Sequence, residues 1–176
     1  MGVPLDFTDR LRRVRLFLCD VDGVLTEAQV SMGGPMETKD FHIRDGLGLR
    51  LLQSEGIRVG WVSARPSEAT RSRAADLKVD FLHQSSAPKV EAIEVILAEA
   101  GLTWREVLYM GDDVVDLAAL RRAGVSAVPA DAILEARAAA HFVARHPGGR
   151  GAVREVVELV LKAQGRWDAL VGRHLK

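Results

Sequence analysis

Short apolar runs alternate with longer amphipathic stretches along this chain. Runs typical of buried strands occur at residues 15–19, 57–62, 80–83, 107–110 and 125–128, and a weaker one occurs at 141–144. Apolar residues recur at helical spacing over residues 45–54, 67–77, 89–100, 114–123 and 131–140. Alternating strands and helices predict right-handed βαβ crossovers. We therefore expect an α/β, Rossmann-like parallel sheet with helices on both faces and a site at the carboxyl ends of its strands.

Local signals mark where several of these helices begin and end. A glycine follows three of the predicted helices: Gly56, Gly101 and Gly124. Ser67 and Asp131 are each placed to cap a helix, and Asp45 is also interpreted as a helix cap. These signals support the predicted boundaries.

Two stretches break the alternation. Residues 27–41 form two short extended segments around Gly33-Gly34-Pro35, which predicts a β-hairpin. Residues 147–151 (PGGRG) predict a flexible hinge at the start of a C-terminal tail, residues 147–176. An amphipathic helix follows the hinge, from residue 152 to about residue 164. We see no interdomain linker, so residues 1–176 are expected to form a single domain.

Composition and charge exclude several classes of protein. The 176 residues are 48% hydrophobic and carry 24 basic and 24 acidic side chains. The net charge is +2 over residues 1–16, −7 over residues 17–136 and +5 over residues 137–176. An acidic body would repel a phosphate backbone, so no nucleic-acid partner is expected. Without an apolar run of membrane-spanning length, a signal-peptide core or a second cysteine beside Cys19, we expect a cytoplasmic protein with no membrane partner.

Acidic side chains follow two of the predicted strands. Asp20 and Asp22 come directly after the first strand, and Asp112, Asp113 and Asp116 follow the strand at 107–110. Carboxylates gathered at one sheet edge repel one another unless a cation lies between them. Carboxylate and carbonyl oxygens are the ligands that Mg²⁺ prefers, together with water and substrate phosphate. The sequence therefore predicts a Mg²⁺ site at this edge.

A hydroxyl group and a lysine lie between the two acidic motifs in the chain. Ser63 ends the second strand, and Lys89 begins a helix. A hydroxyl and a positive charge are suited to hold a phosphoryl group while negative charge develops on its oxygens.

The order of these four motifs resembles that of the haloacid dehalogenase superfamily of aspartyl-phosphate phosphatases. The resemblance implies that Asp20 is the nucleophile and that Asp22 is the general acid and then the base. It implies that Mg²⁺ is held by the carboxylates of Asp20 and Asp112 and by the backbone carbonyl of Asp22. It further implies that Ser63 and Lys89 hold the phosphoryl oxygens. Two more aspartates, Asp113 and Asp116, are then expected to support the metal ligands without being metal ligands themselves.

A narrower resemblance covers residues 16–168. The segment FHIRDGLG at 41–48, the glycines of the predicted hairpin and the segment PGGRGAVRE at 147–155 are similar to the 3-deoxy-D-manno-octulosonate 8-phosphate phosphatases. The resemblance implies hydrolysis of that phosphorylated sugar acid, a step in lipopolysaccharide precursor synthesis. It also implies a hairpin flap in place of a cap domain, a homotetramer whose hairpins pack together, and a tail that closes over a site.

The substrate and the reaction class leave alternatives open. Three arginines are candidates for binding the substrate carboxylate or hydroxyls: Arg44, Arg65 and Arg150. Relatives acting on nine-carbon sugar acids tend to carry an acidic residue where Arg65 stands, so arginine favours the eight-carbon acid. The alternatives are a phosphatase for a nine-carbon 2-keto-3-deoxy sugar acid 9-phosphate, a broad sugar-phosphate phosphatase, and a non-catalytic phosphate-responsive module.

Overall fold

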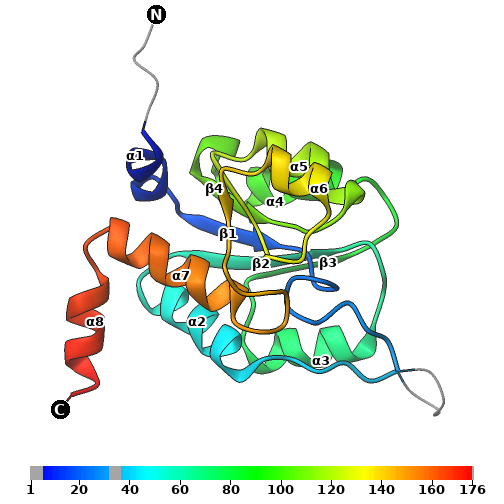
Figure 1. Cartoon of the computed structure of the whole chain (residues 1–176), viewed down its shortest axis with the longest axis horizontal. Coiled ribbons are helices and arrows are strands. Elements are labelled where there is room, and N and C mark those ends of the chain that lie inside the picture. Colours follow the sequence, from blue (N-terminus) through cyan, green and yellow to red (C-terminus); the bar gives the residue numbers. More distant parts are fainter. Residues whose placement is uncertain (1–5, 32–36, 176) are drawn as a thin grey trace, which may run out of the picture.

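The computed structural model describes residues 6–31 and 37–175. All six predicted strands are present and form one parallel sheet in the order β3-β2-β1-β4-β5-β6 (Figure 1). The strands are β1 (Leu16–Cys19), β2 (Arg58–Ser63), β3 (Phe81–Gln84), β4 (Val107–Met110), β5 (Val125–Val128) and β6 (Phe142–Val143). The predicted Rossmann-like α/β fold is therefore confirmed.

The helices match the predicted stretches with two additions. The α-helices are α1 (Phe7–Arg12), α2 (Ile43–Ser54), α3 (Glu68–Asp76), α4 (Lys89–Ala100), α5 (Leu117–Arg122), α6 (Leu134–Ala139), α7 (Ala152–Ala163) and α8 (Trp167–Arg173). Two 3-10 helices, η1 (Trp104–Glu106) and η2 (Val114–Asp116), precede β4 and α5. The predicted helix at 114–123 is thus divided into η2 and α5. Helices α1 and α8 were not predicted because each is short and buries a single residue, Leu11 or Leu170.

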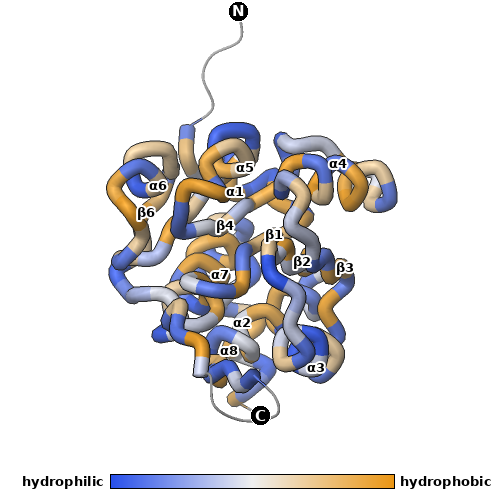
Figure 2. The backbone as a smooth tube through the Cα atoms, turned by 90° about the vertical axis from the view of Figure 1, so that its right-hand side faces the viewer, coloured by the Kyte–Doolittle hydropathy of each residue, from blue (hydrophilic) through white to orange (hydrophobic). Residues whose placement is uncertain are grey.

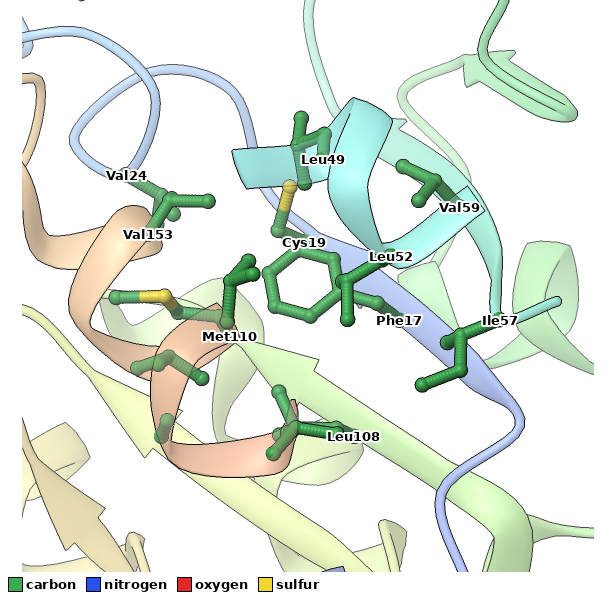
Figure 3. Packing of buried hydrophobic residues seen from close by; sticks show 14 of the residues in the cluster. Phe17, Cys19, Val24, Leu49, Leu52, Ile57, Val59, Leu108, Met110 and Val153 are labelled. Atoms are coloured by element: carbon green, nitrogen blue, oxygen red, sulfur yellow. The ribbon is translucent and has the colours of Figure 1, made fainter. Parts of the chain in front are cut away.

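Helices cover both faces of the sheet, as expected. Alternate side chains of β1 point to opposite faces, so Phe17 and Cys19 lie in one buried cluster and Leu16 and Leu18 lie in the other. Helices α2, α3 and α7 contribute to the first cluster, and α4, α5 and α6 to the second (Figure 1). Figure 3 shows the first cluster, where Phe17 packs between the sheet and the side chains of α2 and α7. Figure 2 shows hydrophobic and hydrophilic stretches alternating along the surrounding helices.

Helix α7 belongs to the core of the domain. Six of its residues are buried against the sheet and α2: Ala152, Val153, Val156, Val157, Val160 and Leu161. The segment before it is also packed, because the Gly149 amide donates to the Val24 carbonyl at 3.0 Å. A Cβ atom on Gly148 would lie 1.9 Å from the Gly23 carbonyl oxygen. The expectation of a flexible hinge at 147–151 is therefore wrong, since the loop after β1 holds these glycines in place.

Two of the predicted helix caps bind elsewhere. Ser67 caps α3 as expected, but Asp131 accepts a hydrogen bond from the Gly148 amide at 2.9 Å and does not cap α6. Asp45 lies in the first turn of α2, yet it accepts from the Gly151 and Arg154 amides at the start of α7, at 3.2 and 2.7 Å. Its carboxylate therefore caps α7 and ties α7 to α2.

The predicted hairpin falls in the connection from β1 to α2. Ser31 and Thr38 form one antiparallel bridge, and the turn at Gly33-Gly34-Pro35 lies outside the described residues. In the described part of this connection there is no helix, so nothing there forms a cap domain. Among the helices of the described residues, none combines the length and apolarity needed to cross a membrane.

Candidate active site

Two acidic loops meet at the carboxyl edge of the sheet. Asp20 follows β1, and Asp112 lies in the loop after β4. Because β1 and β4 are paired with Cys19 opposite Met110, the two loops leave the sheet side by side. One carboxylate oxygen from each of three residues lies within 4.8 Å of the other two: Asp20, Asp112 and Asp116. The two acidic motifs thus form one cluster.

Lys89 joins two of these carboxylates. Its Nζ atom lies 2.8 Å from Asp20 Oδ2 and 2.7 Å from Asp116 Oδ1, and the lysine is buried. Lys89 is the first residue of α4, so the start of this helix fixes the position of the ammonium group. The interaction places a positive charge directly against the proposed nucleophile.

Asp116 is fully buried, and protein donors occupy both of its oxygens. Lys89 and the Tyr109 hydroxyl donate to Oδ1, the latter at 2.5 Å. The amides of Asp112 and Asp113 donate to Oδ2 at 3.0 and 3.2 Å. Asp113 itself is exposed and caps η2 through the Val114 amide. Asp116 therefore acts as the support that orders Lys89 and the 112–113 loop.

Asp112 carries the unpaired oxygen of the cluster. Its Oδ1 atom is buried and has no hydrogen-bond partner among the described residues. Burial, together with the charges of Asp116 and Asp20, raises the pKa of Asp112 from its ordinary value of 3.8 to about 8. Burial also raises the pKa of Asp20 to about 6, against the opposing effect of Lys89.

The cluster fits a hard divalent cation. Three carboxylates gather around one ammonium group, and one oxygen of Asp112 is buried without a hydrogen-bond partner among the described residues. Gly23 leaves the room for Asp112, because a Cβ atom there would lie 2.0 Å from Asp112 Oδ2. Each Asp116 oxygen accepts two hydrogen bonds, whereas each Asp20 oxygen has one donor, the Val21 amide at 2.7 Å or Lys89 at 2.8 Å. Asp20 and Asp112 are therefore the carboxylates with lone pairs left to hold Mg²⁺.

Ser63 lies at the same edge, at the end of β2, and is buried. Its hydroxyl donates to the Arg65 carbonyl at 3.0 Å and accepts from the Arg65 amide at 3.2 Å. Within the described residues it makes no hydrogen bond to the acidic cluster. The tight turn after β2 therefore orients the hydroxyl.

Asp22 lies at the rim of the cluster and is held by residues that sequence reasoning missed. Lys39 Nζ donates to Asp22 Oδ1 at 2.7 Å and to Oδ2 at 2.9 Å. Arg65 Nε lies 3.7 Å from Asp22 Oδ2, and Glu37 pairs with Arg65 at 2.7 Å. Lys39 and Glu37 belong to no motif, and a lone lysine within a predicted hairpin is usually a surface residue, so no pattern in the sequence singles them out.

The three candidate arginines lie in two places. Arg65 is beside Asp22, whereas Arg44 and Arg150 line a separate cavity of about 560 Å³ between the starts of α2 and α7. None of the acidic cluster residues lines that cavity, and Arg150 pairs with Glu27 at 2.9 Å. Of the three, Arg65 is therefore the arginine that lies beside an aspartate of the two acidic motifs, Asp22.

The free energy of unfolding should depend on pH, and the stabilisation by Mg²⁺ should depend on pH as well. The folded, metal-free protein keeps a proton on Asp112 up to about pH 8, whereas the unfolded chain loses it near pH 4. The free energy of unfolding attributable to this group therefore falls as pH rises through that window. Because Mg²⁺ replaces the proton, we expect the rise in Tm caused by Mg²⁺ to grow from about pH 5 to about pH 8.

Thermal unfolding at several pH values, with Mg²⁺ or with EDTA, measures this effect. The Asp112→Asn variant is the matched control and should lose most of the Mg²⁺ response. A Mg²⁺ response that is independent of pH, or equal in the variant, would contradict the assignment.

Comparisons with known proteins agree with this geometry. The chain is 37% identical to "3-deoxy-D-manno-octulosonate 8-phosphate phosphatase KdsC" of Yersinia pestis over 168 residues, which are 95% of this chain and 90% of that protein. It superposes with a TM-score of 0.92 on the Moraxella catarrhalis 3-deoxy-D-manno-octulosonate 8-phosphate phosphatase, whose crystal structure is described as a complex with magnesium ion, phosphate ion and KDO. That neighbour is 34% identical, and the match covers 95% of this chain and 97% of that chain.

A more distant neighbour places the fold in a wider group. A hydrolase of the HAD superfamily, subfamily III A, from Legionella pneumophila is 29% identical with a TM-score of 0.91, and the match covers 96% of this chain and 93% of that chain. A scan against models of protein families finds no match to the chain. On its identity to the curated relatives and its site geometry, the chain belongs to the 3-deoxy-D-manno-octulosonate 8-phosphate phosphatases of the haloacid dehalogenase superfamily.

Proposed function

We propose that this chain is a Mg²⁺-dependent phosphatase that hydrolyses 3-deoxy-D-manno-octulosonate 8-phosphate to the free sugar acid and phosphate. The observation that carries the proposal is the cluster of Asp20, Asp112, Asp116 and Lys89 at the carboxyl edge of the sheet. It supplies a nucleophile, a cation site and a fixed positive charge within one small volume.

The reaction follows from what each side chain can do. Asp20 attacks phosphorus and forms an aspartyl-phosphate, while the bond from phosphorus to the sugar oxygen breaks. Asp22 gives its proton to the departing alkoxide, which leaves as the free sugar hydroxyl. Asp22 then takes a proton from water as that water attacks phosphorus, which releases phosphate and restores the Asp20 carboxylate.

The remaining groups hold the phosphoryl oxygens. Lys89 contacts Asp20 directly, so its ammonium group lies where negative charge develops. The Ser63 hydroxyl is proposed as a second donor from the end of β2. Mg²⁺, held by Asp20, Asp112 and the Asp22 carbonyl, supplies charge neutralisation and a template for the phosphate.

The eight-carbon sugar acid is the substrate we favour. Arg65 lies 3.7 Å from Asp22, and its Nη2 atom is buried without a hydrogen-bond partner among the described residues. A guanidinium with a free donor beside the general acid suits an anionic sugar, because arginine binds carboxylates in a planar fork. The Moraxella neighbour described with KDO gives independent support.

Phosphate release from a panel of sugar phosphates tests the substrate. We expect kcat/KM for the eight-carbon acid 8-phosphate to exceed that for a nine-carbon acid 9-phosphate by about 10-fold or more, because an unpaired buried donor discriminates between ligands. EDTA should abolish release in both cases. Faster turnover of the nine-carbon compound would assign the chain to the alternative substrate, and equal turnover of all sugar phosphates would favour a broad phosphatase.

We further propose that the protein is a homotetramer that acts in the cytoplasm, in lipopolysaccharide precursor synthesis. Three large apolar side chains are exposed on η2 and α6: Val114, Val115 and Leu134. Helix η2 follows the loop that carries Asp112, and the Ile133 amide before α6 donates to the Asp112 carbonyl at 3.0 Å. A neighbouring subunit would therefore cover both elements close to the site. The lone cysteine, Cys19, is buried and free, which suits a reducing compartment.

A further inference from the structure

Lys39 has an environment that is unusual for a lysine. Its side chain is 0% exposed, while the Asp22 side chain that it binds is 25% exposed. Lysine is almost never fully buried unless it is paired, because removing an ammonium group from water is costly. Its Nζ atom donates to both oxygens of Asp22, at 2.7 and 2.9 Å. Both side-chain hydrogen bonds of Lys39 therefore go to the carboxylate of the proposed general acid.

The surroundings of Lys39 are themselves fixed. Glu37 Oε1 lies 3.6 Å from Lys39 Nζ and accepts from the Ser67 hydroxyl at 2.9 Å, and Glu37 Oε2 accepts from Arg65 at 2.7 Å. Ser67 also caps α3. Residues 37–39, which we call the strap, are thus tied to the loop between β2 and α3.

A purely structural role does not explain this arrangement. An ion pair at a protein surface contributes about 0–1 kcal/mol, and a buried lysine is often replaceable by an apolar residue without loss of stability. Contact with both oxygens, however, restrains the orientation of the carboxylate, which a packing residue cannot do. Proton transfer to a leaving group requires that orientation to be set within hydrogen-bonding distance.

We infer that Lys39 is a positioning residue that orients Asp22 for proton transfer to the leaving sugar oxygen. The inference rests on the proposed function, since it requires Asp22 to be the general acid. Lys39 acts through Asp22, because its ion pairs among the described residues are with Asp22 and Glu37 and not with Asp20. Glu37 supports it by holding Lys39 and Arg65 on the same side of the site.

The rate of the first chemical step, measured as sugar acid or p-nitrophenolate released in a single turnover, tests this role, because the later action of Asp22 as a base does not affect that rate. An alkyl phosphate needs a proton on its departing oxygen, whereas p-nitrophenyl phosphate does not, because the nitro group stabilises the phenolate. We expect Lys39→Met to lower this single-turnover rate for the sugar acid phosphate by about 10- to 100-fold, within the range for a displaced general acid. For p-nitrophenyl phosphate we expect a change of less than about 3-fold.

Asp22→Asn and the double variant complete the test. Asp22→Asn should show the same selective loss of rate with the alkyl phosphate. Adding Lys39→Met to Asp22→Asn should lower that rate no further, because both side chains act at the same proton transfer. Lys162→Met is the matched control, since it removes a lysine that pairs with Glu158 at 2.9 Å on the surface of α7. Its kinetics with both substrates should match those of the unmodified protein.

The outcomes separate the inference from the proposed function. If Asp22→Asn slows the single-turnover release of both leaving groups equally, Asp22 is not the general acid and the proposed mechanism fails. If Asp22→Asn is selective but Lys39→Met lowers both substrates equally or neither, the mechanism stands and the role of Lys39 is overturned. Full additivity in the double variant would also overturn it. Circular dichroism of each variant shows that the fold is retained.

Discussion

Replacing Asp20 by asparagine is expected to abolish turnover while leaving the fold intact. Asparagine keeps the shape of the side chain but removes the nucleophilic carboxylate, and losing a nucleophile costs on the order of 10⁴-fold or more in kcat. The variant also relieves repulsion, because Asp20 lies close to Asp112 and Asp116 and burial already raises its pKa. Its Tm in the absence of Mg²⁺ should therefore be equal to or above that of the unmodified protein.

Phosphate release at saturating substrate and Mg²⁺ measures the loss. Asp113→Asn is a suitable control, because Asp113 is an exposed aspartate that lies outside the buried carboxylate cluster. Its kcat should fall far less than that of Asp20→Asn. If Asp20→Asn retains more than a small fraction of activity, Asp20 is not the nucleophile and the reaction proceeds by a different mechanism.

Deleting the chain after Pro147 is expected to unfold the domain. The deletion removes α7 and its six buried residues, and burying each large apolar side chain contributes about 1.5–3 kcal/mol. The summed loss approaches or exceeds the about 5–15 kcal/mol by which domains are stable. It also leaves the buried carboxylate of Asp45 without the two backbone amides that donate hydrogen bonds to it.

Circular dichroism and thermal unfolding compare this deletion with a shorter one. Ending the chain at Gly165 removes α8, in which Leu170 is the buried residue, and should leave a folded and active protein with a lower Tm. The longer deletion should show no cooperative transition. If it instead folds and changes only KM, the tail is a mobile cover and not part of the core.

Features that depend on a regular local pattern or on the order of strands could be predicted from the sequence. The strand at 107–110 and the helix at 89–100 were predicted with correct bounds, because each has a clear apolar period and, for the helix, a glycine at its end. The meeting of Asp20 with Asp112 also followed from the sequence, since strand ends in a parallel sheet share an edge. Regular patterns and topology suffice for such predictions.

The contacts that were missed join segments far apart in the chain. Asp45 caps α7 across more than 100 residues, and Lys39 reaches back to Asp22 across a connection without regular structure. Gly148 and Gly149 resemble a hinge in the sequence, but they are glycines because the backbone of the 23–26 loop lies against them. Neither composition nor periodicity encodes which distant group a polar or small residue meets.

Rapid quenching of turnover tests the central claim most directly. Protein mixed with 3-deoxy-D-manno-octulosonate 8-phosphate and Mg²⁺ is quenched in acid, digested and analysed by mass spectrometry. We predict that the peptide containing Asp20 carries one phosphoryl group during turnover, and that Asp20→Asn carries none. Phosphate release without any phosphoryl group on Asp20, or with the group on another residue, would contradict the account.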